Sequence, residues 1–200
     1  MAVTGLLLVG FLFSHLSGNL LLLKGATAFD DYVHFLNGIA AMPVLELGLA
    51  GLFALHILLA IKLTAENKSA RPVEYSIKAD HGKKSLSSAS MIISGVVILG
   101  FLIKHIYDFR WRKAEFEVAP FELVARTFQD PLTAMVYLLG CGALGFHLFH
   151  AISSAFQTLG FNHPKYTPLI IGVGRAVAIA LAVGFAILPL YFWLSHGGAH

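Results

Sequence analysis

Charged residues are scarce in this chain. Asp, Glu, Lys and Arg make up only 12% of its 200 residues, whereas hydrophobic residues make up 57% and the mean hydropathy is +0.75. A soluble domain carries about a quarter charged residues, so this shortage favours a membrane protein. The formal net charge of +3 is too small and too dispersed to indicate nucleic-acid binding.

Cysteine and the common catalytic motifs are also nearly absent. The single Cys141 lies in an apolar run, which excludes an intrachain disulfide. The sequence has no P-loop, no GxGxxG and no nucleophile constellation, so we expect no catalytic residue in the chain itself. It shows no convincing internal repeat and no low-complexity segment, and its length suits a single unit covering residues 1–200.

Long apolar runs are what the chain has in abundance. A bilayer core needs about 20 apolar residues per helix, and five stretches qualify: 2–23, 42–63, 86–107, 132–156 and 168–194. The first is interpreted as a retained helix rather than a signal peptide, because no Lys or Arg precedes it and it is long for such a peptide. We therefore predict an all-α integral membrane bundle of five transmembrane helices.

The distribution of Lys and Arg predicts how this bundle is oriented. Eight of them lie in or beside the second and fourth connections, against five or six on the other side. By the positive-inside rule, this modest bias places the N-terminus in the cytoplasm. The charged connection at 64–85 would then be cytoplasmic, where it either helps to dock a partner or is merely solvated.

Half of the ten histidines lie inside predicted spans: His15, His56, His105, His147 and His150. Ionisable side chains within a span are rare and usually functional. A single such histidine is often only a hydrogen-bonded structural residue. Five of them on four helices, however, favour a functional explanation.

Depth sorts four of these histidines into two layers. At 1.5 Å per residue, His15 lies roughly 20 Å from the start of its helix and His105 about 28 Å at most from the start of its own. Counted from the opposite, cytoplasmic ends of their helices, His56 lies about 10 Å deep and His147 about 14 Å deep. His15 and His105 therefore belong to an outer layer, and His56 and His147 to an inner one.

Two histidines from two helices at one depth are the ligand set of a bis-histidine haem b. Two layers predict two haems that transfer electrons, because two axial ligands close the iron to substrate. Zinc is less favoured, since its ligands would converge at one depth. His150 is roughly 60° around the helix from His147, so it would contact a haem propionate or a quinone, or simply hydrogen-bond at the interface.

Several stretches resemble one known family. These are "SHLSGNL", "LHILLAI", "KHIYDFRW", "GFHLFHAISSAFQTLG" and, between the first two helices, "AFDDYVHFLNGIAAMPVLELG". Together they resemble the diheme cytochrome b membrane anchor of succinate dehydrogenase and fumarate reductase, in its single-polypeptide form with five helices. The resemblance covers nearly the whole chain, and its specificity comes from four histidines in order on four helices.

The resemblance implies that the axial ligands pair as His56 with His147 and as His15 with His105, in agreement with the depth argument. It also implies a flavoprotein subunit and an iron–sulfur subunit on the cytoplasmic face of the cell membrane. Electrons from succinate would pass through the two b haems to a quinone, typically menaquinone. Some relatives carry a glutamate two residues before the ligand of the fourth helix. Gly145 stands there, which puts that route of proton transfer in doubt.

Other polar residues are candidates for contacts with haem or quinone. Arg175 would either bind a haem propionate or anchor the helix at the inner surface, and Lys104 would reach an outer propionate or extend to the interface. The candidates for protons at an outer quinone site are Glu46, Asp30, Asp31 and His34. For Glu46, a solvated or paired carboxylate is an equal alternative.

Three functions remain open at this point. The first is the membrane anchor of succinate dehydrogenase. The second is a diheme cytochrome b anchor of another quinone-linked oxidoreductase, of the hydrogenase or nitrate reductase type. The third is a haem-free transporter with a histidine relay, although such a protein would more often show broken helices and internal symmetry.

Overall fold

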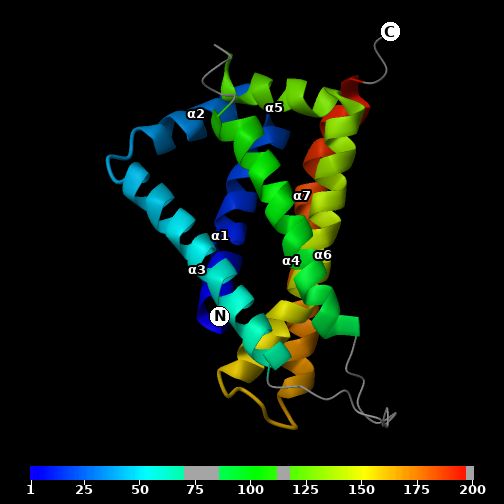
Figure 1. Ribbon diagram of the computed structural model, residues 1–200. Coiled ribbons are helices and arrows are strands. Elements are labelled where there is room, and N and C mark those ends of the chain that lie inside the picture. Colours follow the sequence, from blue (N-terminus) through cyan, green and yellow to red (C-terminus); the bar gives the residue numbers. More distant parts are fainter. Residues whose placement is uncertain (70–85, 112–117, 197–200) are drawn as a thin grey trace.

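The computed structural model describes residues 1–69, 86–111 and 118–196, and over these ranges the chain is built from helices (Figure 1). Most of the connection at 64–85, expected to help in docking, lies outside the described residues. The helices are α1 (Ala2–Asn19) with the 3₁₀ turn η1 (Leu20–Lys24), α2 (Ala26–Asn37), α3 (Met42–Ser69), α4 (Leu86–Ile106) with the π-helical turn η2 (Tyr107–Trp111), α5 (Pro120–Gln129), α6 (Pro131–Thr158) and α7 (Thr167–His196).

Five of these helices are long and apolar enough to cross a membrane. They cover Ala2–Lys24, Met42–Asn67, Met91–Trp111, Pro131–Thr158 and Thr167–Ser195. Each overlaps one of the predicted ranges, so the prediction of an all-α protein with five such helices is confirmed. The cytoplasmic position of the N-terminus stays a prediction.

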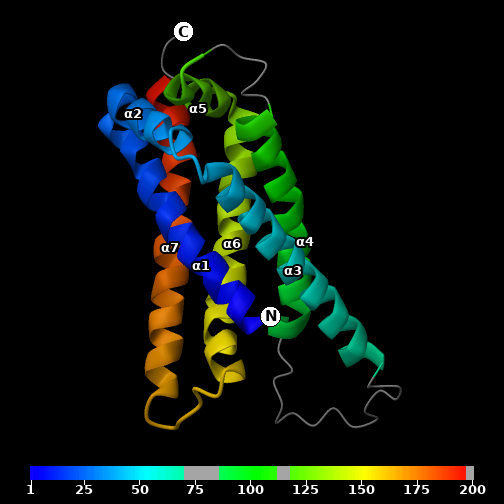
Figure 2. The same ribbon diagram turned by 90° about the vertical axis from the view of Figure 1, so that its left-hand side faces the viewer.

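Two shorter helices, α2 and α5, were not expected and lie across one end of the bundle (Figures 1 and 2). We call this the capped end, and the opposite end, with the α6–α7 turn at 159–166, the open end. The helix α5 begins with Pro120 at a position where no backbone N–H is needed. Its buried face contains Leu123, Val124 and Phe128, at the spacing of an amphipathic helix.

Helices α6 and α7 form the best packed part of the bundle and run antiparallel on either side of the turn at 159–166. Gly160 adopts a positive φ of 90° in this turn, a conformation that glycine adopts without strain. Small residues bring the two helices close, because a Cβ on Gly145 would lie only 2.7 Å from Cβ of Ala182. Their core includes Leu148, Ile152, Ala178 and Leu181.

Helix α3 is packed far more loosely. It contacts mainly α1, and none of the residues in its most apolar stretch is buried. Leu49, Leu52, Phe53, His56 and Ile57 are half-buried and recur at the three- and four-residue spacing of one helix face. The histidine of α3 therefore lies on the face that this helix turns to the rest of the bundle.

Candidate functional site: two histidine pairs on four helices

His15 and His105 lie together near the capped end of the bundle. His15 comes from α1 and His105 from α4, and their ring centroids are 5.7 Å apart with the ring planes at 88°. The sequence placed these two histidines in one layer, and the structure brings their rings into contact.

Aromatic side chains surround this pair. His15 stacks on Phe11 at 5.2 Å and lies 5.7 Å from the ring of Phe185. His105 lies 5.4 Å from the ring of Phe109 and 6.0 Å from that of Tyr137. The positions of both imidazoles are therefore set largely by ring packing.

The ring nitrogens of this pair have few hydrogen-bond partners. Nδ1 of His105 is buried and has no hydrogen-bond partner among the described residues. Nδ1 of His15 lies 3.4 Å from the side-chain amide Nδ2 of Asn19, which also donates to the backbone carbonyl of His15 at 2.8 Å. A buried imidazole nitrogen without a partner is costly, and His105 has one in the described part of the chain.

His56 and His147 lie toward the open end and are held differently. Nδ1 of His56 is 3.0 Å from Oγ1 of Thr4, which belongs to α1. Nδ1 of His147 is 3.1 Å from Oγ of Ser94, which belongs to α4. Glycines adjoin both rings, with Cε1 of His56 against Gly5 and Cε1 of His147 against Gly95.

The other candidates for haem contacts have partners within the protein. His150 packs between the rings of Phe146 and Phe149, and its Nδ1 is 3.3 Å from the Phe146 carbonyl oxygen. The Arg175 guanidinium lies 4.9 Å from the centre of the Phe149 ring and lines an open hollow of about 710 Å³ beside the α6–α7 turn. Neither residue is brought to a histidine pair by a contact between described side chains.

The four candidates for a quinone site do not gather in one place. Asp30 accepts a hydrogen bond of 2.8 Å from the backbone N–H of Phe121, so it caps α5. Glu46 forms an exposed ion pair of 3.1 Å with Arg110. Asp31 and His34 are exposed on α2. Across residues 1–69, 86–111 and 118–196, no hydrogen bond or ion pair joins any two of these four.

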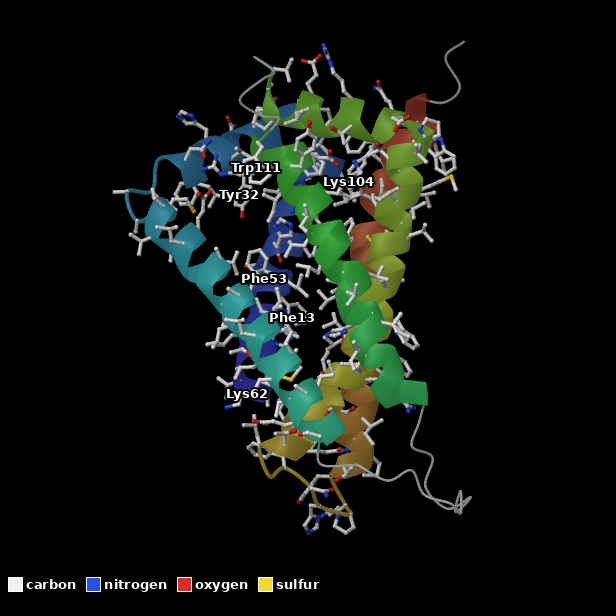
Figure 3. All side chains as sticks on the ribbon, in the orientation of Figure 1. Phe13, Tyr32, Phe53, Lys62, Lys104 and Trp111 are labelled. Atoms are coloured by element: carbon white, nitrogen blue, oxygen red, sulfur yellow. The ribbon has the colours of Figure 1, made fainter. Side chains whose placement is uncertain are left out.

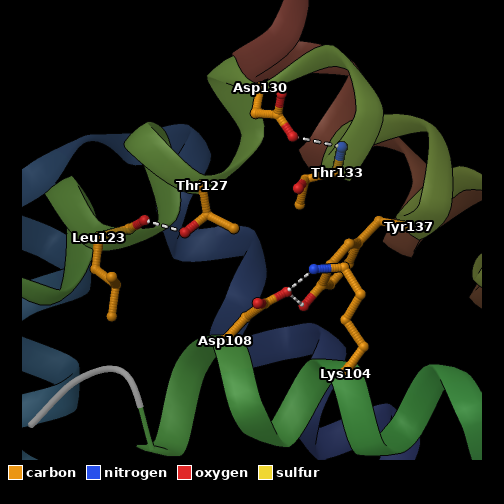
Figure 4. Close-up of polar contacts among 7 residues, drawn as sticks. All are labelled: Lys104, Asp108, Leu123, Thr127, Asp130, Thr133 and Tyr137. Carbon is orange, nitrogen blue, oxygen red and sulfur yellow. Dashed lines mark hydrogen bonds and ion pairs between the residues drawn. The ribbon is translucent and has the colours of Figure 1, made fainter. Parts of the chain in front are cut away.

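Sequence reasoning missed a buried polar network beside His105. The carboxylate of Asp108, 1% exposed, accepts hydrogen bonds from Nζ of Lys104 at 2.8 Å and from the hydroxyl of Tyr137 at 2.9 Å (Figure 4). Lys104, a candidate for a propionate contact, is thus paired within the chain. Asp108 lies in the π-helical turn at the end of α4. The burial of its side chain depends on contacts with other helices, which the sequence pattern does not indicate.

The distribution of charged and aromatic side chains along the bundle is visible in Figure 3. Lys104 and Trp111 lie toward the capped end, Lys62 lies toward the open end, and Phe13 and Phe53 lie between them. Among the described residues, no three His, Cys, Asp or Glu side chains converge as a metal site.

A comparison with known proteins identifies the family. Over 96 residues, the chain is 31% identical to the succinate dehydrogenase hydrophobic membrane anchor subunit of Halobacterium salinarum, a match that covers 48% of this chain and 68% of that protein. The chain belongs to this family of membrane anchor subunits. No protein-family profile and no solved structure matches it. The anchor subunit described here is thus a multi-pass membrane protein with five apolar helices.

Proposed function

We propose that this anchor subunit carries two b haems and transfers electrons from the iron–sulfur subunit of a succinate dehydrogenase complex to a quinone. The observation that carries the proposal is the ring contact between His15 and His105, together with the half-buried positions of His56 on α3 and His147 on α6. Membership of the anchor family supports the complex and favours it over a hydrogenase, a nitrate reductase or a transporter.

The residues at the capped end fit an axial ligand pair. His15 and His105 come from two different helices, their ring centroids are 5.7 Å apart, and imidazole is a common ligand of haem iron. Ring packing on Phe11 and Phe109 holds the two imidazoles in place. His15 and His105 would therefore hold one iron.

The residues at the open end fit a second axial pair. His56 and His147 are both half-buried and face the bundle interior. His56 and His147 would hold the second iron.

The residues of the chain orient the two groups and keep water away from them. When bound, a bis-histidine haem supplies one-electron transfer, since both axial positions of its iron are taken. Phe109, Phe128 and Tyr137 lie in mutual ring contact beside His105, where they exclude water from the capped end. Removing water favours electron transfer with little rearrangement of the surroundings.

We also propose partner subunits, an electron acceptor and a membrane location for this chain. A flavoprotein subunit and an iron–sulfur subunit would dock on the cytoplasmic face of the cell membrane, next to the His56–His147 pair. The proposed acceptor is menaquinone, on the strength of the resemblance to the diheme class. The sequence identity to an anchor subunit of succinate dehydrogenase supports these partners. It does not indicate which quinone is the acceptor.

Affinity purification of the tagged chain from mild detergent, followed by addition of succinate, tests this function. We expect both partner subunits to co-purify and succinate to reduce two haems per chain and then a menaquinone analogue. In the His147→Ala variant, quinone reduction should fall more than tenfold, whereas His163→Ala, in the exposed turn, should behave like the wild type. Purification without a succinate-oxidising partner would contradict the proposal.

A further inference from the structure

Two buried hydroxyl groups contact the histidines of the open end. Thr4 and Ser94 are 7% and 6% exposed, and each lies across a helix interface from an imidazole. Oγ1 of Thr4 is 3.0 Å from Nδ1 of His56, and Oγ of Ser94 is 3.1 Å from Nδ1 of His147. Both distances are those of good N–H···O hydrogen bonds.

Each of the two hydroxyl groups also has a backbone carbonyl within hydrogen-bond distance. A serine or threonine hydroxyl has one proton to donate. Thr4 donates it to the backbone carbonyl of Met1 at 2.8 Å, and Ser94 donates it to that of Met91 at 3.2 Å. A hydroxyl that donates to its carbonyl can only accept from Nδ1–H of the imidazole, and this arrangement is the one that leaves Nε2 free for a metal ion.

A neutral imidazole that carries its proton on Nδ1 has a free lone pair on Nε2. We propose that Thr4 and Ser94 are positioning residues that hold His56 and His147 as Nδ1–H tautomers, with Nε2 of each ring available to an iron. This inference rests on the proposed function and assigns a role to two residues outside the ligand set. A hydrogen bond to the second nitrogen orients a ligating imidazole and raises its basicity.

Among the described residues, no hydroxyl group forms a hydrogen bond with a histidine of the capped end. Nδ1 of His105 has no hydrogen-bond partner in the described part of the chain, and Nδ1 of His15 faces the side-chain amide of Asn19. The two pairs therefore differ in the group that faces Nδ1 of each imidazole. Loss of the hydroxyls should change the midpoint potential of the open-end haem only. The other haem in the same molecule then serves as an internal reference.

A redox titration of the haems in the purified complex tests this inference. The variants are Thr4→Val, which keeps the shape of the side chain, Ser94→Ala, and Thr4→Ser, which restores the hydroxyl. The matched controls are Ser153→Ala and Thr64→Val, because these hydroxyls also bond to a carbonyl of their own helix and contact no imidazole. The component that disappears in His147→Ala identifies the haem of the open end.

We expect Thr4→Val and Ser94→Ala to raise the midpoint potential of the open-end haem, since a less basic imidazole stabilises ferric iron less. The other haem, Thr4→Ser and both controls should match the wild type. Loss of the open-end haem alone in both hydroxyl-free variants, with its retention in Thr4→Ser, would support the same role. Two haems with unchanged potentials would overturn this inference alone, whereas a wild-type chain without haem would overturn the proposed function.

Discussion

At the capped end of the bundle His15 and His105 lie among aromatic rings, whereas at the open end His56 and His147 are held by hydroxyl groups. The capped end is closed by α2 and α5 over a core that includes Phe29, Phe128 and Phe192. Helix α3, which carries His56 and runs from the capped end to the open end, has no buried residue in its apolar stretch. Packing thus positions one pair, and directional hydrogen bonds position the other.

The same contrast is seen in two ion pairs with identical spacing. Lys104–Asp108 and Lys62–Glu66 both join a lysine to an acid four residues later. The first pair, at the capped end, is 2.8 Å long with Asp108 1% exposed. The second, at the open end, is 3.8 Å long with side chains 70% and 58% exposed. Burial, and not the sequence spacing, decides how much each pair matters.

The largest expected effect comes from removing the buried acid. Asp108→Ala should lower the free energy of unfolding by about 3 kcal/mol, the lower end for a broken buried pair, because Lys104 is one-third exposed. Glu66→Ala should change it by less than about 0.5 kcal/mol. Denaturant titrations in detergent, followed by circular dichroism, measure both, and equal effects would remove the contrast between the two ends.

A glycine-to-alanine series sharpens the comparison of packing. A Cβ on Gly140 would overlap the ring of Phe101, which packs on Tyr137 and His105. Gly140→Ala should therefore destabilise the fold by about 1–3 kcal/mol.

Two alanine variants serve as controls in the same unfolding titration. Gly142→Ala lies on the same helix with open space around it, and Gly95→Ala would place its Cβ 3.8 Å from His147, an ordinary contact. Both should be neutral or slightly stabilising, since alanine favours a helix over glycine. A neutral Gly140→Ala would show that the capped end is less tightly packed than described.

The smallest effect concerns the cap of α6 at the capped end. Asp130 accepts hydrogen bonds from the side chain and the backbone N–H of Thr133, and these lower the pKa of its carboxyl from the ordinary 3.8. A lowered pKa means that the charged cap stabilises the folded state fully above about pH 5 and loses this contribution as the pH falls below 4.

The thermal midpoint of Asp130→Asn against that of the wild type, measured from pH 7 to pH 3, tests this cap. Asparagine is an equally good cap and has no titrating group. The two proteins should therefore have similar thermal midpoints at pH 7. The wild type should then lose more stability than the variant on acidification. Parallel pH profiles would contradict the role of the carboxylate.

Local properties of the chain could be predicted from the sequence. An apolar run is recognised from consecutive residues, and so is a histidine inside it. The five long helices and their histidines could therefore be predicted. The helix α5 was missed although Pro120 followed by Leu123, Val124 and Phe128 carries the signature of a short amphipathic helix. Its ten residues are too few to be recognised by a search for long spans.

The partners of the polar side chains could not be predicted. Thr4 meets His56 across 52 positions, and Ser94 meets His147 across 53. Threonine and serine in an apolar helix normally bond to their own backbone, and both do so here as well. The second contact of each hydroxyl exists only because two helices pack in one particular register, which the sequence pattern leaves open.

The central claim is that two histidine pairs hold two haems, and haem counted per chain from a dithionite-reduced minus oxidised spectrum tests it most directly. The account predicts a low-spin b-type spectrum with two haems per chain in the wild type and in His163→Ala, and one in His147→Ala. A well-folded wild-type chain from haem-replete cells with a flat spectrum would contradict the account, as would two haems retained in His147→Ala.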